Sequence, residues 1–566
     1  MSGVGSDPVA GDEWRLARRF AQLTIEFRDA TTLDELLARV VRAAVDVVDQ
    51  CDAASITWSD GGAPWTPAAS DVIAERADLL QYAAEEGPCL AALDEATVVL
   101  TGREWDRWPT LGASWHSVDA RSVLSCRLVP PDTSGCRGAL NLYSKAIDAF
   151  DADAQETAVV LAAHGATAVA ASVRERDGRV ADALIRIVES ARLLPPDRLA
   201  DLALEVSASF GVRAVRIFLV EHSLRRLLPY ADSSVEAFDV DGTMGGRAYL
   251  TNELVEARHD DHVVVWAPLR DGVDRLGVIQ FEVDQLDDSR RETLTRIAAI
   301  VAAEIVSKSQ YTDLFELARR DRAMSIGADL QRDLMPPQTF ATRDLSVVSA
   351  IEPAYAAAGD TCDYAYNDGV LHAAVFDAIG HDFNASVISA AAVAAYRHTR
   401  RLDADLAQIA ATIDAAVDDQ FADAMFITAI LVTLDVGSGL LRWINAGHPP
   451  PLHIRNGRVI GTMGGPSVPP LGLASATGRS APGHIYEAAL EPGDRVLLYT
   501  DGIIEARSAN GDDFGLARLR EFLQRAIASQ TADAEIVRRL SHAVVDHHHG
   551  KLKDDATLLM ISWHPD

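Results

Sequence analysis

The chain has 566 residues, 48% hydrophobic residues and a formal net charge of −31. This length exceeds what one hydrophobic core usually supports, so we expect two to four domains, and the acidic charge argues against nucleic acid or an anionic membrane as a partner. The sequence shows no signal-peptide pattern and no long uncharged apolar run, and its five cysteines lack disulfide or zinc spacing, so we expect a cytoplasmic protein.

Residues 1–175 are predicted to form an N-terminal helix followed by a domain of helices and strands. Apolar side chains on one face predict a helix within residues 1–29, and Thr32 with Glu35 three positions later predicts the cap of a second helix. The segments EEGPCLAAL, SVLSCRLV and GALNLYS then lead into a long helix. This order of segments resembles a GAF domain over residues 30–175, and the resemblance implies a central antiparallel sheet flanked by helices.

The same plan repeats in residues 176–308, after the long helix that begins near Asp151. The strands AVRIFLVE, HVVVWAPLR and RLGVIQFEV resemble those of a second GAF domain. We expect the long helix to pack against its copy in a homodimer, and a surface helix without a partner is the alternative. Each domain could sense an unknown small ligand, although core packing explains Cys89 and the tryptophans that follow it better than a ligand pocket does.

Residues 309–337 are predicted to form a helical linker to the C-terminal domain. Leucine, isoleucine and valine recur through residues 288–335 at three- and four-residue steps or their multiples, which is typical of a signalling coiled coil, with a lone amphipathic helix as the alternative. The helix should end before Pro336, because α backbone is disfavoured for a residue that precedes proline. We expect reorientation of this helix to transmit a signal from the GAF-like domains to the C-terminal domain.

Residues 338–566 change to short strands and tight turns, and several aspartates stand where a strand begins or ends. These aspartates are Asp360, Asp363, Asp377, Asp501, Asp554 and Asp555. A charge at the end of a buried strand is unfavourable unless it is paired or binds a metal, and carboxylates without a His or Cys ligand set favour Mg²⁺ or Mn²⁺. Two such ions about 3.5–4 Å apart can lower the pKa of a bridging water and clamp a phosphoryl group.

Eight short motifs follow one another in this region. They are LQRDLMPP at 330–337, AAGDTCD at 357–363, FDAIGHD at 376–382, MFITA at 425–429, NAGHPPP at 445–451, PLGL at 470–473, LEPGDRVLLYTDGIIEA at 490–506 and KDDATLL at 553–559. Their order resembles that of the PPM family of metal-dependent (PP2C-type) serine/threonine phosphatases, in its SpoIIE/RsbU branch. The resemblance implies a β-sandwich flanked by helices. The expected fold class is therefore α+β, with two GAF-like α/β sensor domains joined by long helices to a PP2C-like sandwich.

The resemblance also implies a role for each residue of the site. Two ions, Mn²⁺ or Mg²⁺, would be bound by Asp360, Asp377, Asp501, Asp554 and the backbone carbonyl of Ala378. Asp377 would be the catalytic centre of this set, because it would bridge both ions and the attacking hydroxide. The residues that would support the site are Asp363, Gly502 and Asp555.

Several positions depart from the family pattern or leave their role open. Ala358 and Phe376 stand where the family has glycine, and Asp382 adds negative charge beside the expected substrate approach. His381 is either the general acid for the leaving serine oxygen or a histidine that stabilises the turn.

Three further positions carry reactive or metal-ligating side chains but fit a structural role better. We expect His448 to be structural. The run His547 to His549 fits a solvated helix end, because adjacent residues do not share a helix face. Cys362 needs no role, and a redox-sensing thiol is the alternative.

These features favour an enzyme, a phosphoserine/phosphothreonine protein phosphatase regulated by its GAF-like domains. By family resemblance, its substrate would be a phosphorylated STAS-type anti-anti-sigma protein in a partner-switching pathway. One alternative is a catalytically inactive, phosphatase-like signalling scaffold. Another is a small-ligand receptor whose main function lies in the GAF pair.

Overall fold

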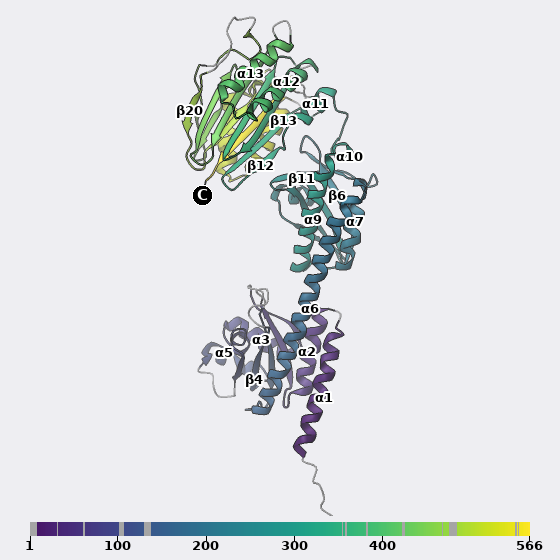
Figure 1. Ribbon diagram of the computed structural model, residues 1–566. Helices are drawn as coiled ribbons and strands as arrows, with labels where there is room; N and C mark the ends of the chain where they lie inside the picture. Colours follow the sequence, from purple (N-terminus) through teal and green to yellow (C-terminus); the bar gives the residue numbers. More distant parts are fainter. Residues whose placement is uncertain are drawn as a thin grey trace, which may run out of the picture. The chain divides into compact units, whose positions relative to one another are not determined.

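The structure is a computed structural model, and it describes residues 8–30, 32–59, 63–100, 107–129, 137–353, 355–356, 359–380, 383–421, 425–466, 468–474, 484–548, 552 and 554–565 (Figure 1). The chain divides into two compact units, Met1–Asp182 and Ala183–Asp566. Both contain helices and antiparallel sheets, which confirms the expected fold class. Within the described ranges, the helices lack the length and apolar character that crossing a membrane requires.

The first unit is one antiparallel sheet between two layers of helices. Its strands, in the order β2-β1-β5-β4-β3, are β1 (Ala53–Ser59), β2 (Trp65–Ala69), β3 (Thr97–Leu100), β4 (Ser122–Val129) and β5 (Arg137–Ser144). Its helices are α1 (Pro8–Arg28), α2 (Leu33–Val47), α3 (Val72–Ala84), α4 (Pro88–Ala91), α5 (Pro109–Ser114), the 3₁₀ turn η2 (Trp115–Ser117) and the first part of α6 (Ala152–Leu193).

The two faces of this sheet pack on different helices because strand side chains alternate. Leu140 and Leu142 pack with α1, α2 and α6, whereas Ala139 and Tyr143 face α3 and α5. The predicted antiparallel sheet with helices on both sides is therefore confirmed.

The second unit begins with another antiparallel sheet domain of the same plan. Its strands, in the order β8-β7-β6-β11-β10-β9, are β6 (Val212–Val220), β7 (Arg226–Pro229), β8 (Phe238–Asp239), β9 (Val255–Arg258), β10 (Val263–Asp271) and β11 (Asp274–Val283). The helices are the end of α6, η3 (Pro196–Arg198), α7 (Leu199–Ser207), η4 (Ala208–Phe210), α8 (Met244–Thr251) and α9 (Asp288–Ser309). We call residues 183–309 the second sheet domain.

The linker differs from the predicted continuous helix. Only two short helices follow Ser309, namely α10 (Leu314–Ala318) and α11 (Ile326–Leu334). Of the residues predicted to form a coiled coil, Ile297 and Val301 are buried in the core of the second sheet domain, whereas Leu314 and Leu317 are exposed. The prediction of a continuous coiled coil is therefore wrong, because the helix is interrupted after Ser309 and the apolar face of α9 is used in an intramolecular core. Helix α11 does end before Pro336, as predicted.

The C-terminal domain is a sandwich of two antiparallel sheets. One sheet has the order β12-β13-β22-β21-β18-β19, and the other has the order β14-β15-β16-β17-β20. The first contains β12 (Thr339–Ala341), β13 (Leu345–Glu352), β18 (Leu452–Arg455), β19 (Arg458–Thr462), β21 (Arg495–Tyr499) and β22 (Ala556–Trp563). The second contains β14 (Asp360–Asn367), β15 (Val370–Ala378), β16 (Ile427–Asp435), β17 (Leu440–Ala446) and β20 (Tyr486–Ala489).

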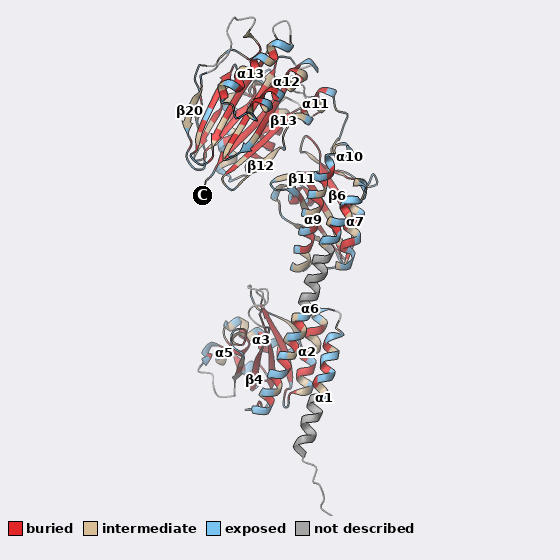
Figure 2. Cartoon of the chain, in the orientation of Figure 1, coloured by how far each residue is buried: buried red, intermediate tan, exposed pale blue. Residues whose placement is uncertain are grey.

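Helices cover the outer face of each sheet, so the strands are buried on both sides (Figure 2). The β14–β20 sheet packs on α12 (Phe383–Arg400) and α13 (Leu406–Gln420). The opposite sheet packs on α16 (Gly515–Ala528) and α17 (Asp533–His547), and the short α15 (Asp501–Ile504) follows β21. A third core fills the space between the sheets. The predicted β-sandwich flanked by helices is confirmed.

Candidate metal centre

Two of the predicted carboxylates lie side by side in one sheet. Asp360 begins β14 and is the direct partner of Asp377 in the antiparallel register of β14 and β15. Cys362 and Val375, each two residues away along its strand, belong to the core between the sheets, so both carboxylates project from the inner face. Directly opposed residues of this kind have Cβ atoms about 4.5–5.5 Å apart. The register therefore places both acids at the same end of the sandwich.

The opposite sheet brings Asp501 and Asp554 to the ends of neighbouring strands. Asp501 follows β21, and Asp554 with Asp555 precedes β22, which pairs antiparallel with β21. The end of one strand thus lies beside the start of the other. Gly502 permits this approach, because a Cβ atom at that position would overlap the backbone carbonyl oxygen of Asp555. Gly502 therefore supports the site sterically.

Hydrogen bonds tie the two sheets together at this end. The Oδ2 atom of Asp360 accepts hydrogen bonds from the Oγ1 atoms of Thr500 at 2.7 Å and Thr557 at 2.8 Å, both from the opposite sheet. In return, Oδ2 of Asp555 accepts the backbone N–H groups of Gly359 at 2.6 Å and Asp360 at 3.1 Å. Asp555 thus holds the backbone that leads into Asp360.

The carboxylates raise one another's pKa. Burial, followed by the charges of Asp501, Asp554 and Asp555, raises the pKa of Asp377 to about 7. Burial and then the Asp377 carboxylate raise the pKa of Asp360 well above its ordinary range, and burial with Asp554 raises that of Asp501. In the part of the chain that the structure describes, no lysine or arginine pairs with Asp360, Asp377 or Asp501. Buried like charges of this kind call for a bound cation.

The donor set fits a hydrated divalent cation. Within the described ranges, no three Asp, Glu, His or Cys side chains surround one point as a complete set of metal ligands. All the available donors are nevertheless carboxylate oxygens, which are the ligands that Mg²⁺ and Mn²⁺ prefer. Because Mg²⁺ retains several waters, one or two carboxylates per ion suffice. The residues that could hold ions are Asp360, Asp377, Asp501 and Asp554.

Asp363 does not join this group. It lies three residues after Asp360, so its side chain projects from the opposite face of β14. There it accepts hydrogen bonds from Nε and Nη2 of Arg397 at 3.1 and 2.9 Å, and from Nη1 of Arg400 at 3.0 Å. Both arginines belong to α12. Asp363 thus anchors α12 to the sheet, and its supporting role for the metal centre stays a prediction.

The remaining predicted residues keep the status of predictions. Ala378 is buried in β15, and its N–H donates to the carbonyl of Gly359 at 3.3 Å. The use of its own carbonyl as a metal ligand stays a prediction. His381 and Asp382 lie outside the described residues, so the general-acid hypothesis for His381 also stays a prediction.

The sequence reasoning missed three residues that position Asp360. Besides Thr500 and Thr557, Gln331 of α11 donates from Nε2 to the backbone carbonyl of Asp360. Thr500 occupies the N-cap position before Asp501, and a threonine at that place in the sequence is a recognisable signal. Gln331 carries no such signal, because its partner is distant in the sequence.

Two side chains that could have a redox or metal-binding role do not fit such a role. Cys362 is fully buried, and burial raises the pKa of its thiol to about 12, so it lacks the exposed, low-pKa character of a redox sensor. His547 contacts the carbonyl of Asp512 through Nε2 at 3.0 Å and the side chain of Arg518 through Nδ1 at 2.8 Å. His549 lies outside the described residues.

Comparisons with known proteins agree with this picture. Residues 367–564 match the family model described as Stage II sporulation protein E (SpoIIE). Protein IcfG of Synechocystis sp. is 31% identical over 139 residues, which make up 24% of this chain and 21% of IcfG. The match thus spans about a fifth of the curated relative's length.

Two solved structures each resemble a part of the chain. The RsbU and RsbW domains of Rv1364c from Mycobacterium tuberculosis are 27% identical, with 39% of this chain and 62% of that chain covered and a TM-score of 0.32. The nlh2 GAF domain of A. aeolicus is 15% identical, with 23% of this chain and 98% of that chain covered and a TM-score of 0.21. It is the family match at residues 367–564 that identifies the C-terminal domain, which belongs to the SpoIIE family of PP2C-type domains.

Proposed function

We propose that this chain is a divalent-metal-dependent protein serine/threonine phosphatase. The observation that carries the proposal is the convergence of Asp360, Asp377 and Asp501 from two sheets at one end of the sandwich. Asp360 is buried, and Asp377 and Asp501 are partly buried. The three carboxylates raise one another's pKa, and no lysine or arginine among the described residues neutralises them. The SpoIIE family membership of residues 367–564 supports the same activity.

Asp360, Asp377, Asp501 and Asp554 would hold two Mn²⁺ or Mg²⁺ ions. When bound, such ions lower the pKa of a water and neutralise charge on a phosphoryl group. The protein's contribution is to keep the carboxylates in place, with Asp555 fixing the backbone at Asp360. Asp554 is exposed, so the set of four carboxylates is accessible at Asp554 to a phosphorylated side chain of another protein.

The test uses the full-length protein and a phosphoserine peptide. We expect hydrolysis to require Mn²⁺ or Mg²⁺, to stop with a chelator, and to fall at least about 10–100-fold in Asp377→Asn and Asp501→Asn. Glu487→Gln, an exposed carboxylate in the same domain, serves as the matched control and should behave as wild type. Activity that survives in both aspartate variants would refute the proposal. Calorimetry addresses the inactive-scaffold alternative, since a scaffold need not bind two ions.

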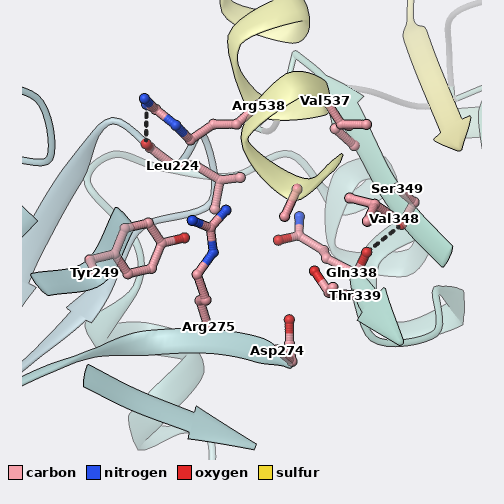
Figure 3. A pocket seen from close by; sticks show the side chains of 12 residues that line it. Leu224, Tyr249, Asp274, Arg275, Gln338, Thr339, Val348, Ser349, Val537 and Arg538 are labelled. Carbon is pink, nitrogen blue, oxygen red and sulfur yellow. Dashed lines mark hydrogen bonds between the residues drawn. The ribbon is translucent and has the colours of Figure 1, made fainter. Parts of the chain in front are cut away.

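We also infer that the second sheet domain, which resembles a GAF domain, regulates this activity through direct contact with α17. The side chain of Arg538 on α17 is 2% exposed, pairs with Asp241 at 2.9 Å, and donates from Nη1 to the carbonyl of Leu224 at 3.4 Å (Figure 3). His542 of the same helix contacts the carbonyl of Ser223 through Nε2 at 2.7 Å.

The two surfaces pack closely around these contacts. A cavity of about 510 Å³ lies between α8 and the start of α17. The cavity beside Arg538 measures about 20 Å³, and its lining includes Tyr249, Asp274, Arg275, Gln338, Thr339 and Arg538 (Figure 3). That volume admits about one water molecule. The contacts around Arg538 are therefore closely packed and can transmit a shift.

Tyr355 connects this interface with the candidate metal centre. Its hydroxyl donates to Oε2 of Glu221 at 2.7 Å and accepts the backbone N–H of Asp321 at 3.1 Å, while the guanidinium of Arg322 covers its ring at 4.7 Å. Tyr355 lies a few residues before Asp360 in the chain. A shift of the Glu221 loop is thus expected to move the segment that enters the metal centre.

The regulatory proposal is tested with Tyr355→Phe, which removes only the hydroxyl. We expect turnover or Mn²⁺ affinity to change, because the link to Glu221 is lost. Tyr366→Phe, an exposed tyrosine on β14, is the control. If Tyr355→Phe and Glu221→Gln both leave turnover and Mn²⁺ affinity at wild-type values, this route of regulation is wrong.

The partners are proposed on the family resemblance. A phosphorylated STAS-type anti-anti-sigma protein is the proposed substrate, an unknown small ligand the proposed signal, and a homodimer the proposed assembly. Loss of phosphate from a purified phosphorylated STAS protein, in a reaction that needs both the chain and Mn²⁺, tests the substrate. Sedimentation equilibrium tests the dimer.

A further inference from the structure

A buried histidine between the two sheets has its backbone held in place from both sides. Gly447 has a φ of +70°, in the left-handed region that favours glycine, and it turns the chain after β17. The side chain of Asn445 then spans this turn, with Nδ2 donating to the carbonyl of His448 at 2.7 Å and Oδ1 accepting its N–H at 2.9 Å. The side chain of His448 is directed inward as a result, and the residue is 4% exposed.

The imidazole of His448 reaches the strand beside the candidate metal centre. Its Nδ1 atom lies 2.8 Å from Oγ1 of Thr428. Thr428 is the direct partner of Asp377 in the register of β15 and β16, and residues two positions along each strand, Val375 and Ile430, lie in the core between the sheets. Thr428 and Asp377 therefore project side by side from the inner face.

The surroundings of His448 decide which atom carries the proton of this hydrogen bond. Burial lowers the pKa of His448 to about 3, so the ring is neutral and has one donor nitrogen and one acceptor nitrogen. The backbone of Tyr499 acts in the opposite direction and raises the pKa, as a carbonyl acceptor does. Because Nδ1 faces Thr428, Nε2 is the nitrogen left to point its N–H toward this backbone, although it has no partner at normal hydrogen-bond geometry within the described residues. Nδ1 is then the acceptor.

This tautomer fixes the direction of the Thr428 hydroxyl. Thr428 donates its proton to His448, so its oxygen presents only lone pairs toward the neighbouring carboxylate of Asp377. An acceptor beside a carboxylate is unfavourable unless a donor lies between them. The waters that Mg²⁺ and Mn²⁺ retain are strong donors of this kind.

We propose that Thr428 and His448 are positioning residues of the metal centre, which together hold an acceptor for a water of the hydrated divalent cation beside Asp377. Neither residue is among the carboxylates that would hold the ion. The inference rests on the proposed function, because it assumes that a cation binds at Asp377. The inference assigns a role to the turn Ala446-Gly447-His448, which follows β17 and brings the imidazole to Thr428 on β16.

The experiment measures Mn²⁺ binding to the full-length protein by calorimetry, without any assay of turnover. Thr428→Val keeps the shape of the side chain and removes the hydroxyl, and we expect it to weaken Mn²⁺ binding by about tenfold or more. Thr428→Ser restores the hydroxyl and should restore affinity. His448→Leu should weaken binding to a similar degree, because it releases the hydroxyl from its fixed direction.

The outcomes separate the two proposals. If the wild-type chain binds no Mn²⁺, the proposed function and this inference fail together. If the wild type binds Mn²⁺ and Thr428→Val binds it equally well, only the inference is overturned. A purely structural role would lower the melting temperature of Thr428→Val and leave its Mn²⁺ affinity unchanged. The Thr428 variants decide the question even if His448→Leu does not fold.

Discussion

Replacing Asp363 with alanine separates an anchoring role from a metal-binding one. The side chains of Asp363 and Arg400 are 2% and 7% exposed, and that of Arg397 is 28% exposed. Removing one partner of a buried ion pair typically costs about 3–5 kcal/mol, because the other charge remains buried and unpaired. We therefore expect Asp363→Ala to destabilise the C-terminal domain by about that amount. Mn²⁺ affinity under native conditions should change little, since this side chain projects away from the other carboxylates.

The assay is urea denaturation of the full-length chain, with hydrogen exchange followed in peptides from β14 and α12. The matched control is Glu487→Ala, which removes an ion pair with Arg442 at 2.6 Å. Both of its partners are about half exposed, so the expected loss is about 1 kcal/mol or less. The reasoning is refuted if Asp363→Ala is as mild as this control, or if it weakens Mn²⁺ binding while the stability of the domain is unchanged.

Three further predictions concern other parts of the chain. Burial raises the pKa of Asp78 in the first unit from its ordinary 3.8 to about 6. Between these pH values the folded state therefore binds more protons than the unfolded state. The contribution of Asp78 to stability is full below pH 3.8 and is lost as the pH rises to about 6. The loss should reach about 3 kcal/mol, seen as faster hydrogen exchange in α3, and Asp78→Asn should abolish this pH dependence. Gly502→Ala should cost about 1–3 kcal/mol or more in a thermal melt, because the new Cβ overlaps the carbonyl of Asp555; a melting temperature equal to that of wild type would contradict the close approach. Cys362 should resist iodoacetamide at pH 8 and react only in denaturant, whereas rapid labelling of the native protein would revive the redox hypothesis.

The positions of the acids were predictable because they follow from local patterns. A polar residue at the end of a buried strand is visible in the sequence, and the hairpin at Asn367-Asp368-Gly369 makes Asp360 and Asp377 neighbours. The same alternation of side chains also places Asp363 on the opposite face of its strand.

Contacts between distant segments were beyond sequence reasoning. Nothing local indicates that Gln331 meets the backbone of Asp360, or that Arg538 pairs with Asp241. The linker prediction failed for a related reason. An apolar repeat indicates that a helix face is buried, but it does not say whether the partner is a second chain or the same chain, and here Ile297 and Val301 lie in an intramolecular core.

The central claim is that carboxylates from two sheets form a divalent-metal site for phosphoester hydrolysis. Its most direct test is phosphate release from a phosphoserine peptide while Mn²⁺ is titrated into the chelator-treated, full-length chain. We predict no release without metal and a saturable rise with Mn²⁺ that Asp377→Asn abolishes. Release that is independent of the metal, or no release at any Mn²⁺ concentration from a chain shown to be folded, would contradict the claim.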